Sequence, residues 1–377
     1  MQRDTIVYFG IIQYEYNNAM CQHVKGIEKL IESSGYKALT IGVSPNVKRK
    51  TFTQYNKNSY VINEPQNILD HISECLSAKD IKRIIMEIGI DTIHSFIMAD
   101  FRYLPMKQMW KFCEKNGIQF AVNVMDCFMS EKNIFSIIKK IDCDIRMKFF
   151  YPKIDRRIYI CSAYNSLIGK GKYTSVIPGV TWRRKIDRNK NKQDERIQLV
   201  FLGRPGLKCE KEKIDWIIKA IAENGLSDKF RLLLAGFDEK EFIRNNKQLT
   251  KWLSESTVFC GRISHDQCIN MLMNADFSLI IRPNSVLSQY GFSTKIGEAF
   301  SCGTPVLVTD TSDNSIYIEN GKNGFICEAN YEAVRTMIKH VAKLNSDDIS
   351  AMKKNIIKNN PLDYTRYIHS FMKVIRS

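Results

Sequence analysis

Apolar stretches of strand length alternate with amphipathic stretches of helix length along almost the whole chain. In the first half, the strand-like segments are Thr5–Ile11, Lys37–Val43, Thr92–Ile97, Ile118–Val124, Arg157–Cys161 and Thr174–Ile177. Helical patterns lie between them, one of them capped at Asn18 and another running from Pro65 to Ile88. Strands that alternate with helices predict parallel sheets covered by helices. The polar stretch from Lys48 to Asn63 predicts a loop or a short hairpin.

The alternation stops at Pro178-Gly179 and restarts after a basic, polar segment, residues 181–196, that has the composition of a linker. The strands predicted beyond it are Ile197–Gly203, Phe230–Gly236, Thr257–Cys260, Asp276–Ile281 and Pro305–Thr309, and the helices are Cys209–Asn224, Ser264–Asn274 and Thr294–Ser301. We therefore expect an α/β fold with two doubly wound, Rossmann-like domains, residues 1–180 and 197–360, that face each other across a cleft. The tail, residues 361–377, predicts an amphipathic helix. Ligands of such sheets bind outside the carboxyl ends of the strands.

The most informative stretch for function is residues 282–327. After a predicted strand, the loop Tyr290-Gly291-Phe292-Ser293-Thr294 leads into a helix that carries Lys295 and Glu298. Free N–H groups and the positive end of the helix dipole make such a helix start an anion site. Gly291 lets backbone approach a ligand, and a carboxylate one turn into the helix suits a ribose diol. Lys295 can contact phosphate or pair with a carboxylate.

A second glycine-bearing loop, Gly203-Arg204-Pro205-Gly206-Leu207-Lys208, follows the apolar strand near Leu199. Fixed cations in such a loop stabilise negative charge on phosphate groups. Arginine grips two phosphate oxygens, whereas lysine acts as a point charge. Arg204 and Lys208 therefore fit a diphosphate, although on their own they would suit an ordinary surface turn.

Together these motifs resemble the donor-binding region of retaining GT-B glycosyltransferases of family four. The run Gly291-Phe-Ser-Thr-Lys295 before the block Glu298-Ala…Cys302-Gly-Thr-Pro-Val is most similar to the branch that builds bacterial capsules and other surface polysaccharides. The family pattern has two acidic residues separated by seven others. The second matches Glu298, and the first falls on Tyr290, which is not acidic.

The resemblance implies residue roles. Arg204 and Lys208 would contact the donor diphosphate and assist catalysis, and Glu298 would hold the ribose. Backbone at Gly261 and Ile263 would face the nucleobase, and the loop that contains Tyr290, Gly291, Phe292, Ser293, Thr294 and Lys295 would hold the rest of the donor. In family members the final helix often crosses back to the first domain, which we expect of residues 361–377.

The first domain contributes looser matches. Its first loop and helix resemble the acceptor side of family members, where Gln13 and Asn18 are the candidates, with Tyr14 and His23 nearby. His23 lies inside a helical pattern, which favours a structural role. Asp126, after the strand Ile118–Val124, is a candidate catalytic residue, and His94, after Asp91–Ile93, is a weaker one.

Composition narrows the alternatives. The 377 residues carry a net charge of +16, but the basic residues are dispersed and no nucleic-acid-binding signature is present. Eleven scattered cysteines, and a start without signal-peptide shape, favour a cytoplasmic protein with reduced thiols. Asp142-Cys143-Asp144 matches an Asp-x-Asp metal motif, but its place in the first domain argues against metal binding. We expect no metal and no cofactor, and no nucleic acid among the partners.

The predicted function is transfer of a sugar from a nucleoside-diphosphate sugar to a hydroxyl of a surface-polysaccharide acceptor, itself lipid-linked, with retention and without metal. The positive charge predicts peripheral contact with the anionic inner face of the membrane, where such acceptors sit. Two alternatives remain open. One is a non-catalytic subunit that binds nucleotide sugar or glycan in an assembly complex, and the other is a sugar-nucleotide epimerase of the GT-B type.

Overall fold

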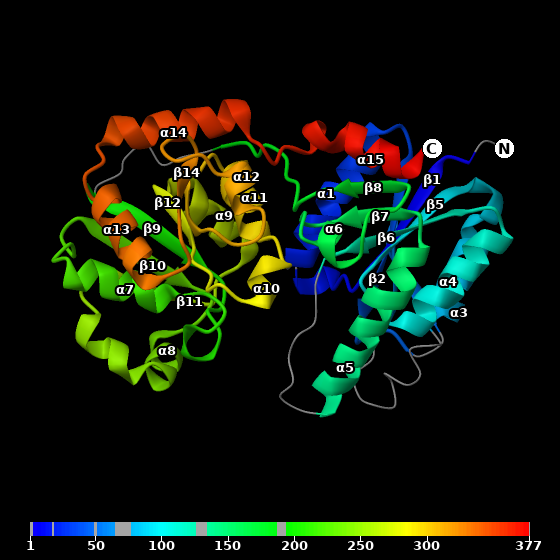
Figure 1. Ribbon diagram of the computed structural model, residues 1–377, viewed down its shortest axis with the longest axis horizontal. Helices are drawn as coiled ribbons and strands as arrows, with labels where there is room; N and C mark the ends of the chain where they lie inside the picture. The colour runs from blue at the N-terminus through cyan, green and yellow to red at the C-terminus, as the bar shows by residue number, and fades with distance from the viewer. Residues whose placement is uncertain are drawn as a thin grey trace. The chain divides into compact units, whose positions relative to one another are not determined.

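The computed structural model describes residues 3–16, 19–48, 51–64, 77–125, 134–186 and 194–376. The chain forms two compact units (Figure 1). Unit 1 comprises Met1–Val180 together with Tyr364–Ser377, and unit 2 comprises Thr181–Asp363.

Unit 1 contains an eight-stranded sheet in the order β3-β4-β2-β1-β5-β6-β7-β8, parallel except for the antiparallel pair β3 and β4. The strands are β1 (Thr5–Phe9), β2 (Lys37–Ser44), β3 (Phe52–Asn56), β4 (Ser59–Asn63), β5 (Ile93–Ala99), β6 (Gln119–Val124), β7 (Arg156–Tyr159) and β8 (Tyr173–Val176). The stretch predicted as a loop or hairpin is thus a hairpin that extends the sheet beyond β2. All five residues of β1 are buried, as expected for a central strand covered on both faces.

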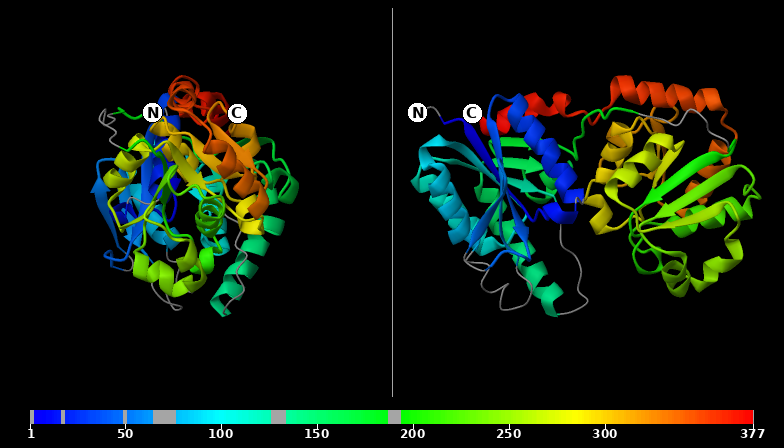
Figure 2. Two further views of the ribbon diagram at one scale, coloured as in Figure 1. Left: turned by 90° about the vertical axis from the view of Figure 1, so that its left-hand side faces the viewer. Right: turned by 180° about the vertical axis from the view of Figure 1, so that it is seen from behind.

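Helices cover both faces of this sheet (Figure 2). They are α1 (Ala19–Ser33), α3 (Ser77–Ile88), α4 (Tyr103–Lys115), α5 (Ile134–Ile145), α6 (Tyr164–Leu167) and α15 (Ile368–Ile375). Short turns complete the set: η1 (Tyr14–Tyr16), η3 (Ile90–Thr92), the π-helical η4 (Arg146–Phe150), η5 (Tyr151–Lys153) and η8 (Tyr364–Tyr367). The cap predicted at Asn18 and the first part of the helix predicted from Pro65 lie outside the described residues.

The tail helix α15 packs into unit 1, although almost the whole of unit 2 separates it in sequence from the strands it covers. Phe371, Val374 and Ile375 are fully buried. The Ser175 hydroxyl of β8 donates to the Ser370 carbonyl at 2.8 Å, and Arg156 of β7 donates to the Val374 carbonyl. Polar and apolar contacts therefore both fix the tail against β7 and β8.

Unit 2 contains a six-stranded, wholly parallel sheet in the order β11-β10-β9-β12-β13-β14. The strands are β9 (Ile197–Leu202), β10 (Phe230–Ala235), β11 (Thr257–Gly261), β12 (Phe277–Ile280), β13 (Val306–Thr309) and β14 (Gly324–Cys327). The helices are α7 (Ile214–Glu223), α8 (Glu239–Asn245), α9 (His265–Asn274), α10 (Val286–Gln289), α11 (Thr294–Ser301), α12 (Asn314–Tyr317), α13 (Tyr331–Val341) and α14 (Ser346–Asn359), with 3-10 turns η6 (Leu207–Cys209) and η7 (Lys247–Trp252).

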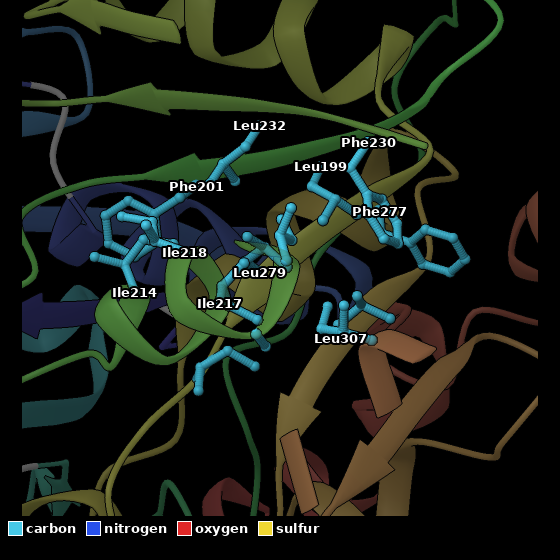
Figure 3. Packing of buried hydrophobic residues seen from close by; sticks show 14 of the residues in the cluster. Leu199, Phe201, Ile214, Ile217, Ile218, Phe230, Leu232, Phe277, Leu279 and Leu307 are labelled. Atoms are coloured by element: carbon cyan, nitrogen blue, oxygen red, sulfur yellow. The ribbon is translucent and has the colours of Figure 1, made fainter. Parts of the chain in front are cut away.

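Alternate residues of the strands build the core of unit 2 (Figure 3). Leu199 and Phe201 of β9 point to one face, because successive side chains of a strand alternate. They meet Ile217 and Ile218 of α7, and all four are at most 1% exposed. Packing of this kind fixes β9, and with it the loop that leaves its carboxyl end.

The predicted fold class is confirmed: each unit is a doubly wound, Rossmann-like α/β layer structure. The largest error in a predicted boundary is at α7. The helix expected from Cys209 begins at Ile214, because Lys208 and Cys209 adopt left-handed backbone angles, with φ of 52° and 56°, that a right-handed α-helix cannot include. β14, α13 and α14 lie beyond the last predicted strand, and the pattern analysis did not identify them.

Candidate functional site

The strand order of unit 2 reverses direction between β9 and β12. Chain order runs outward from β9 through β10 to β11 on one side, and from β12 through β13 to β14 on the other. In open α/β sheets, ligands bind outside the carboxyl ends of the strands at such a switch point. Residues 203–213 leave β9 here and residues 281–293 leave β12, so both loops singled out from the sequence meet at this edge.

The loop after β9 holds its two candidate cations outward. Gly206 has φ of 84° and Lys208 of 52°, and the buried Cys209 anchors the turn through its thiol, 3.7 Å from Asn246 Oδ1. A non-glycine residue in the left-handed region is strained, and such strain persists only where the surroundings impose it. Arg204 and Lys208 are exposed, and neither has an ion-pair or hydrogen-bond partner within the described part of the chain.

A pocket of about 230 Å³ opens between this loop and α8. Its lining residues are Arg204, Pro205, Gly206, Leu207, Phe237, Glu241, Phe242, Asn245 and Asn246. Phe237 and Phe242 stack with ring centroids 5.3 Å apart, which gives the pocket an aromatic wall. Arg204 therefore stands at the rim of a partly apolar hollow.

Lys295 does not extend to solvent as a free cation. Its Nζ lies 2.7 Å from Oε1 of Glu212, a side chain that is only 1% exposed, and 4.7 Å from the centroid of the Phe201 ring. Burial lowers the pKa of Lys295, and the Glu212 carboxylate acts in the opposite direction. Of the two roles the sequence left open for Lys295, the structure shows the ion pair with a carboxylate.

Arg282 completes this cluster at the end of β12. Its Nε lies 3.8 Å from Glu212 Oε1, and its Nη1 donates to the Gly291 carbonyl at 3.0 Å. The Thr309 hydroxyl of the neighbouring strand receives the Arg282 N–H at 2.8 Å. Glu212, Lys295 and Arg282 thus tie together the β9 loop, α11 and residues 290–294. Glu212 Oε2 is buried without a hydrogen-bond partner among the described residues.

The loop before α11 is packed rather than loose. Phe292 is 7% exposed, and its ring meets that of Tyr317 edge to face, with centroids 5.3 Å apart. Ser293 occupies the N-cap position of α11 without a side-chain capping bond. Gly291 is not among the left-handed glycines, so its small size, rather than its backbone angle, suits a close approach. The Phe292 side chain anchors the loop. The N–H groups at the start of α11 are then the hydrogen-bond donors that this loop offers to a ligand.

Glu298 is a half-buried carboxylate one turn into α11. Burial raises its pKa, and the positive charges of Arg184 and Lys295 oppose that rise. Arg184 is held beside it, because its backbone N–H donates to the Ser301 carbonyl and its Nε to the Ser301 hydroxyl, both at 3.2 Å. Glu298 itself has no hydrogen-bond partner within the described residues.

The remaining residues predicted for the donor also lie in unit 2. Gly261 ends β11 with φ of 65°, and its carbonyl accepts the Gly236 N–H at 2.8 Å. Ile263 follows as a half-buried side chain, and Tyr290 caps the carboxyl end of α10. These residues lie in loops that follow β11 and β12.

In unit 1, the predicted acceptor-side residues are mostly engaged in internal contacts. Gln13 donates to Glu64 Oε1 at 2.6 Å, and Tyr14 donates to Thr40 Oγ1 at 2.7 Å. Burial raises the pKa of Tyr14 to about 12. His23 is buried, with Nε2 2.9 Å from Asn123 Nδ2, consistent with the structural role favoured from its helical position.

His94 is the second residue of β5, so it is at the amino end of a strand rather than at the carboxyl end. Its ring stacks on Tyr36 at 4.7 Å, and its Nε2 lies 2.9 Å from the Ile375 carbonyl of α15. The placement of His94 after the end of a strand was wrong, because β5 begins at Ile93 and runs to Ala99. Asp126 and Asn18 lie outside the described residues.

Asp142, from the Asp-x-Asp match, belongs to a buried network. Its Oδ2 accepts from Arg146 Nε at 2.8 Å and its Oδ1 from the Tyr103 N–H at 2.9 Å. Arg146 also donates to Asp100 Oδ1 at 3.0 Å, and Asp100 accepts from the Tyr151 hydroxyl at 2.6 Å. The carboxylate therefore stabilises the junction of α5 with the rest of unit 1. Among the residues described, no group of three or more acidic, His or Cys side chains is arranged to hold a metal.

Sequence reasoning missed Glu212 and Arg282 as members of the site. Glu212 precedes Lys295 by 83 residues, and the helix that was expected to contain it does not. Arg282 carried a usable signal, because it directly follows a buried strand at the predicted switch point.

Comparison with known proteins agrees with this geometry. Residues 196–347 match the family described as glycosyl transferases group 1. A stretch of 84 residues is 34% identical to trehalose phosphorylase from Grifola frondosa, and it spans 22% of this chain and 10% of that protein. The match thus covers about a tenth of the relative's length.

Solved structures resemble the whole chain. Sucrose-phosphate synthase from Thermosynechococcus elongatus superposes with a TM-score of 0.71 at 13% identity, over 99% of this chain and 98% of that one. Alr3699/HepE from Anabaena, solved in complex with UDP and glucose, gives 0.66 at 14% identity over 99% of both chains. The fold is that of GT-B glycosyltransferases, and the match to the glycosyl transferases group 1 family lies within unit 2. The enzyme class predicted from the sequence is confirmed at this level.

Proposed function

We propose that this protein transfers a sugar from a nucleoside-diphosphate sugar to a hydroxyl of a growing surface glycan. The observation that carries the proposal is the convergence at the β9–β12 switch point of two outward cations, a helix start and a half-buried carboxylate. Diphosphate suits the cations and the N–H groups, and a ribose diol suits the carboxylate. The relative solved with UDP and glucose supports a uridine diphosphate donor.

In this reaction, Arg204 and Lys208 hold the donor diphosphate and stabilise the charge that develops on it. The bond between the anomeric carbon and the phosphate oxygen breaks, and a bond to the acceptor oxygen forms on the same face, with retention. The acceptor proton passes to the leaving phosphate oxygen, so no protein base is obligatory. Arg204, Lys208 and the start of α11 supply positive charge that a metal would otherwise supply, and we propose that transfer is metal-independent.

Glu298 binds the ribose hydroxyls as an acceptor of two hydrogen bonds. Its carboxylate must be charged for this role, and Arg184 and Lys295 favour the charged form against the effect of burial. Lys295 does not bind the donor directly in this proposal, because its ammonium group forms an ion pair with Glu212. Backbone of Gly261, Ile263 and residues 290–294 would complete donor recognition, with Tyr290 replacing the acidic residue of the family pattern.

On the acceptor side the proposal rests on the sequence resemblance. The acceptor would be a lipid-linked glycan at the cytoplasmic face of the membrane. Gln13 and Asn18 remain its predicted neighbours, and Asp126 remains a predicted catalytic residue. Within the described residues, no helix is long and apolar enough to cross a bilayer.

The test combines donor binding with turnover. Thermal unfolding of the purified chain is followed with UDP-, GDP-, ADP- and dTDP-sugars, where a donor at 100 times its dissociation constant adds about 2.7 kcal/mol of stability. Arg204→Ala, Lys208→Ala and Glu298→Gln should each weaken donor binding by on the order of 1.5–3 kcal/mol, since each removes a charge-assisted contact. Lys229→Ala and Glu255→Gln, exposed residues outside the switch point, are the controls.

Donor binding that is unchanged in both cation variants would refute the phosphate assignment. Donor hydrolysis or transfer to lipid-linked acceptor, assayed with and without EDTA, then separates the candidates. A binding subunit would give a thermal shift without turnover, and complete, metal-reversible loss of activity in EDTA would contradict the metal-independent mechanism.

A further inference from the structure

The segment by which the chain enters unit 2 passes the carboxyl end of α11. This connecting segment, residues 181–186, is anchored at its start, where the Thr181 N–H donates to the Leu362 carbonyl at 2.8 Å. Three residues later it is anchored again at Ser301, the last residue of α11. Arg184 donates from its backbone N–H to the Ser301 carbonyl and from Nε to the Ser301 hydroxyl, both at 3.2 Å. These contacts fix the backbone and the side chain of Arg184 against α11.

The anchor holds Arg184 beside Glu298. Residues three positions apart lie on the same side of a helix, so Ser301 and Glu298 share one side of α11. Ser301 is only 2% exposed, which makes it a firm attachment point. The Arg184 guanidinium also lies 5.4 Å from the centroid of the Trp182 ring. A cation that is already held in place does not have to be ordered when a ligand binds, which lowers the cost of binding.

Glu298 depends on a cation of this kind. Its carboxyl is half-buried, and burial raises its pKa. The positive charge of Arg184 is the largest influence in the opposite direction, followed by that of Lys295 on the same helix. The Lys295 ammonium is already paired with Glu212 at 2.7 Å. Arg184 therefore does more than Lys295 to keep Glu298 charged.

The other elements that pack against α11 are α9, α14 and β12. The Cys268 thiol of α9 interacts with Glu298, and burial raises the pKa of this thiol, so it stays uncharged near neutral pH. His265 lies one turn before Cys268 and is the other titratable side chain on that side of α9. The half-buried Lys353 of α14 pairs with Asp276 at 2.9 Å.

We propose that Arg184 is a positioning residue of the donor site, which keeps the Glu298 carboxylate charged and oriented toward the ribose of the donor. The inference rests on the proposed function, in which Glu298 binds the ribose hydroxyls. It makes the connecting segment part of the donor site, although 117 residues separate Arg184 from its anchor at Ser301 in the sequence. Arg184 acts through Glu298 and does not have to touch the donor itself.

The experiment is calorimetric titration of the full chain between pH 5.5 and 8 with UDP-glucose, or with GDP-, ADP- or dTDP-glucose if one of these stabilises the wild type more. A sugar nucleotide has no terminal phosphate, so a phosphate pKa of about 6 does not enter the profile. In Arg184→Gln the pKa of Glu298 rises further, and donor affinity should begin to fall at a higher pH than in the wild type. A rise of one pKa unit weakens affinity about tenfold on the acid side and changes it little at pH 8.

Matched variants separate this role from a merely structural one. Arg183→Gln removes the exposed neighbouring cation and should bind donor within about twofold of the wild type at every pH, because solvent screens its charge. Arg184→Lys keeps the charge and should recover most of the affinity on the acid side. In a Glu298→Gln background, Arg184→Gln should have no further effect. A structural Arg184 would instead weaken binding equally in both backgrounds. His265 is present in every variant, so the ratio of two affinities removes its contribution.

The outcomes distinguish the role of Arg184 from the role of Glu298. If Glu298→Gln binds donor as the wild type does, the ribose assignment in the proposed function fails, and the role of Arg184 fails with it. If Glu298→Gln weakens binding but Arg184→Gln keeps the wild-type affinity and pH profile, only the role of Arg184 is overturned. Urea unfolding midpoints that match the wild type show that a weakened variant is still folded.

Discussion

The buried ion pair of Glu212 and Lys295 joins the loop after β9 to α11 at the switch point of unit 2, and its contribution to stability can be tested directly. Glu212 is 1% exposed and Lys295 24% exposed at the side chain, and their charged atoms are 2.7 Å apart. Removal of one partner leaves the other charge buried, which typically costs about 3–5 kcal/mol. Replacement of both by uncharged groups of similar shape costs much less, because no charge remains to be desolvated.

We therefore expect Glu212→Gln to lower the free energy of unfolding by about 3 kcal/mol or more. Lys295→Met should fall near the low end of the same range, because Arg282 remains 3.8 Å from Glu212 and compensates part of its charge. The double variant should be more stable than the two single losses predict, with a coupling energy of roughly 2 kcal/mol.

Urea unfolding of the four proteins at pH 7.5 measures these values. If the loss of stability in the double variant equals the sum of the two single losses within about 0.5 kcal/mol, the coupling is refuted. The view that Glu212 and Lys295 stabilise each other as an ion pair then fails as well.

Three further outcomes are expected. Burial lowers the pKa of His23 to about 4, below its unfolded value, so stability should fall by about 3 kcal/mol as pH drops from 6.5 to 4, and His23→Leu should remove that part of the pH dependence in chemical unfolding. Arg146→Met removes the cation that the mostly buried carboxylates of Asp100 and Asp142 share and should cost about 3–5 kcal/mol in urea unfolding. Gly236→Ala places a Cβ 2.5 Å from the Gly203 carbonyl oxygen at φ of 115° and should cost more than 2 kcal/mol, whereas Gly225→Ala, with open space at φ of 62°, should cost only about 1 kcal/mol.

The layered fold followed from the sequence because strand and helix periods are local and repeat often. The run Ile197–Leu202 is almost entirely apolar, and the neighbouring strands of the sheet show the same pattern. The switch point then followed from general rules of parallel sheets. Loop geometry did not follow. The residue types of Lys208 and Cys209 do not predict a left-handed backbone, so the helix start was placed five residues early.

The site was predictable to the extent that its residues are neighbours in sequence. Glu298 and residues 290–294 share one segment, and their arrangement follows from a loop that enters a helix. The partner of Lys295 was not predictable, since contact with Glu212 depends on how two loops 83 residues apart fold over the sheet edge. His94 was misplaced because the strand was ended at Ile93, whereas β5 begins there and runs to Ala99, which puts His94 near its amino end.

The tail helix α15 has a consequence for how the chain is made. Unit 2 is one uninterrupted run of residues, whereas unit 1 needs α15 to cover β7 and β8. During synthesis, unit 2 can complete its core while unit 1 still lacks Phe371, Val374 and Ile375. At ribosomal speed, that interval is roughly 10–40 s. The nascent chain therefore carries an open apolar surface until residues 368–375 emerge, and chaperone contact with unit 1 should persist until that moment.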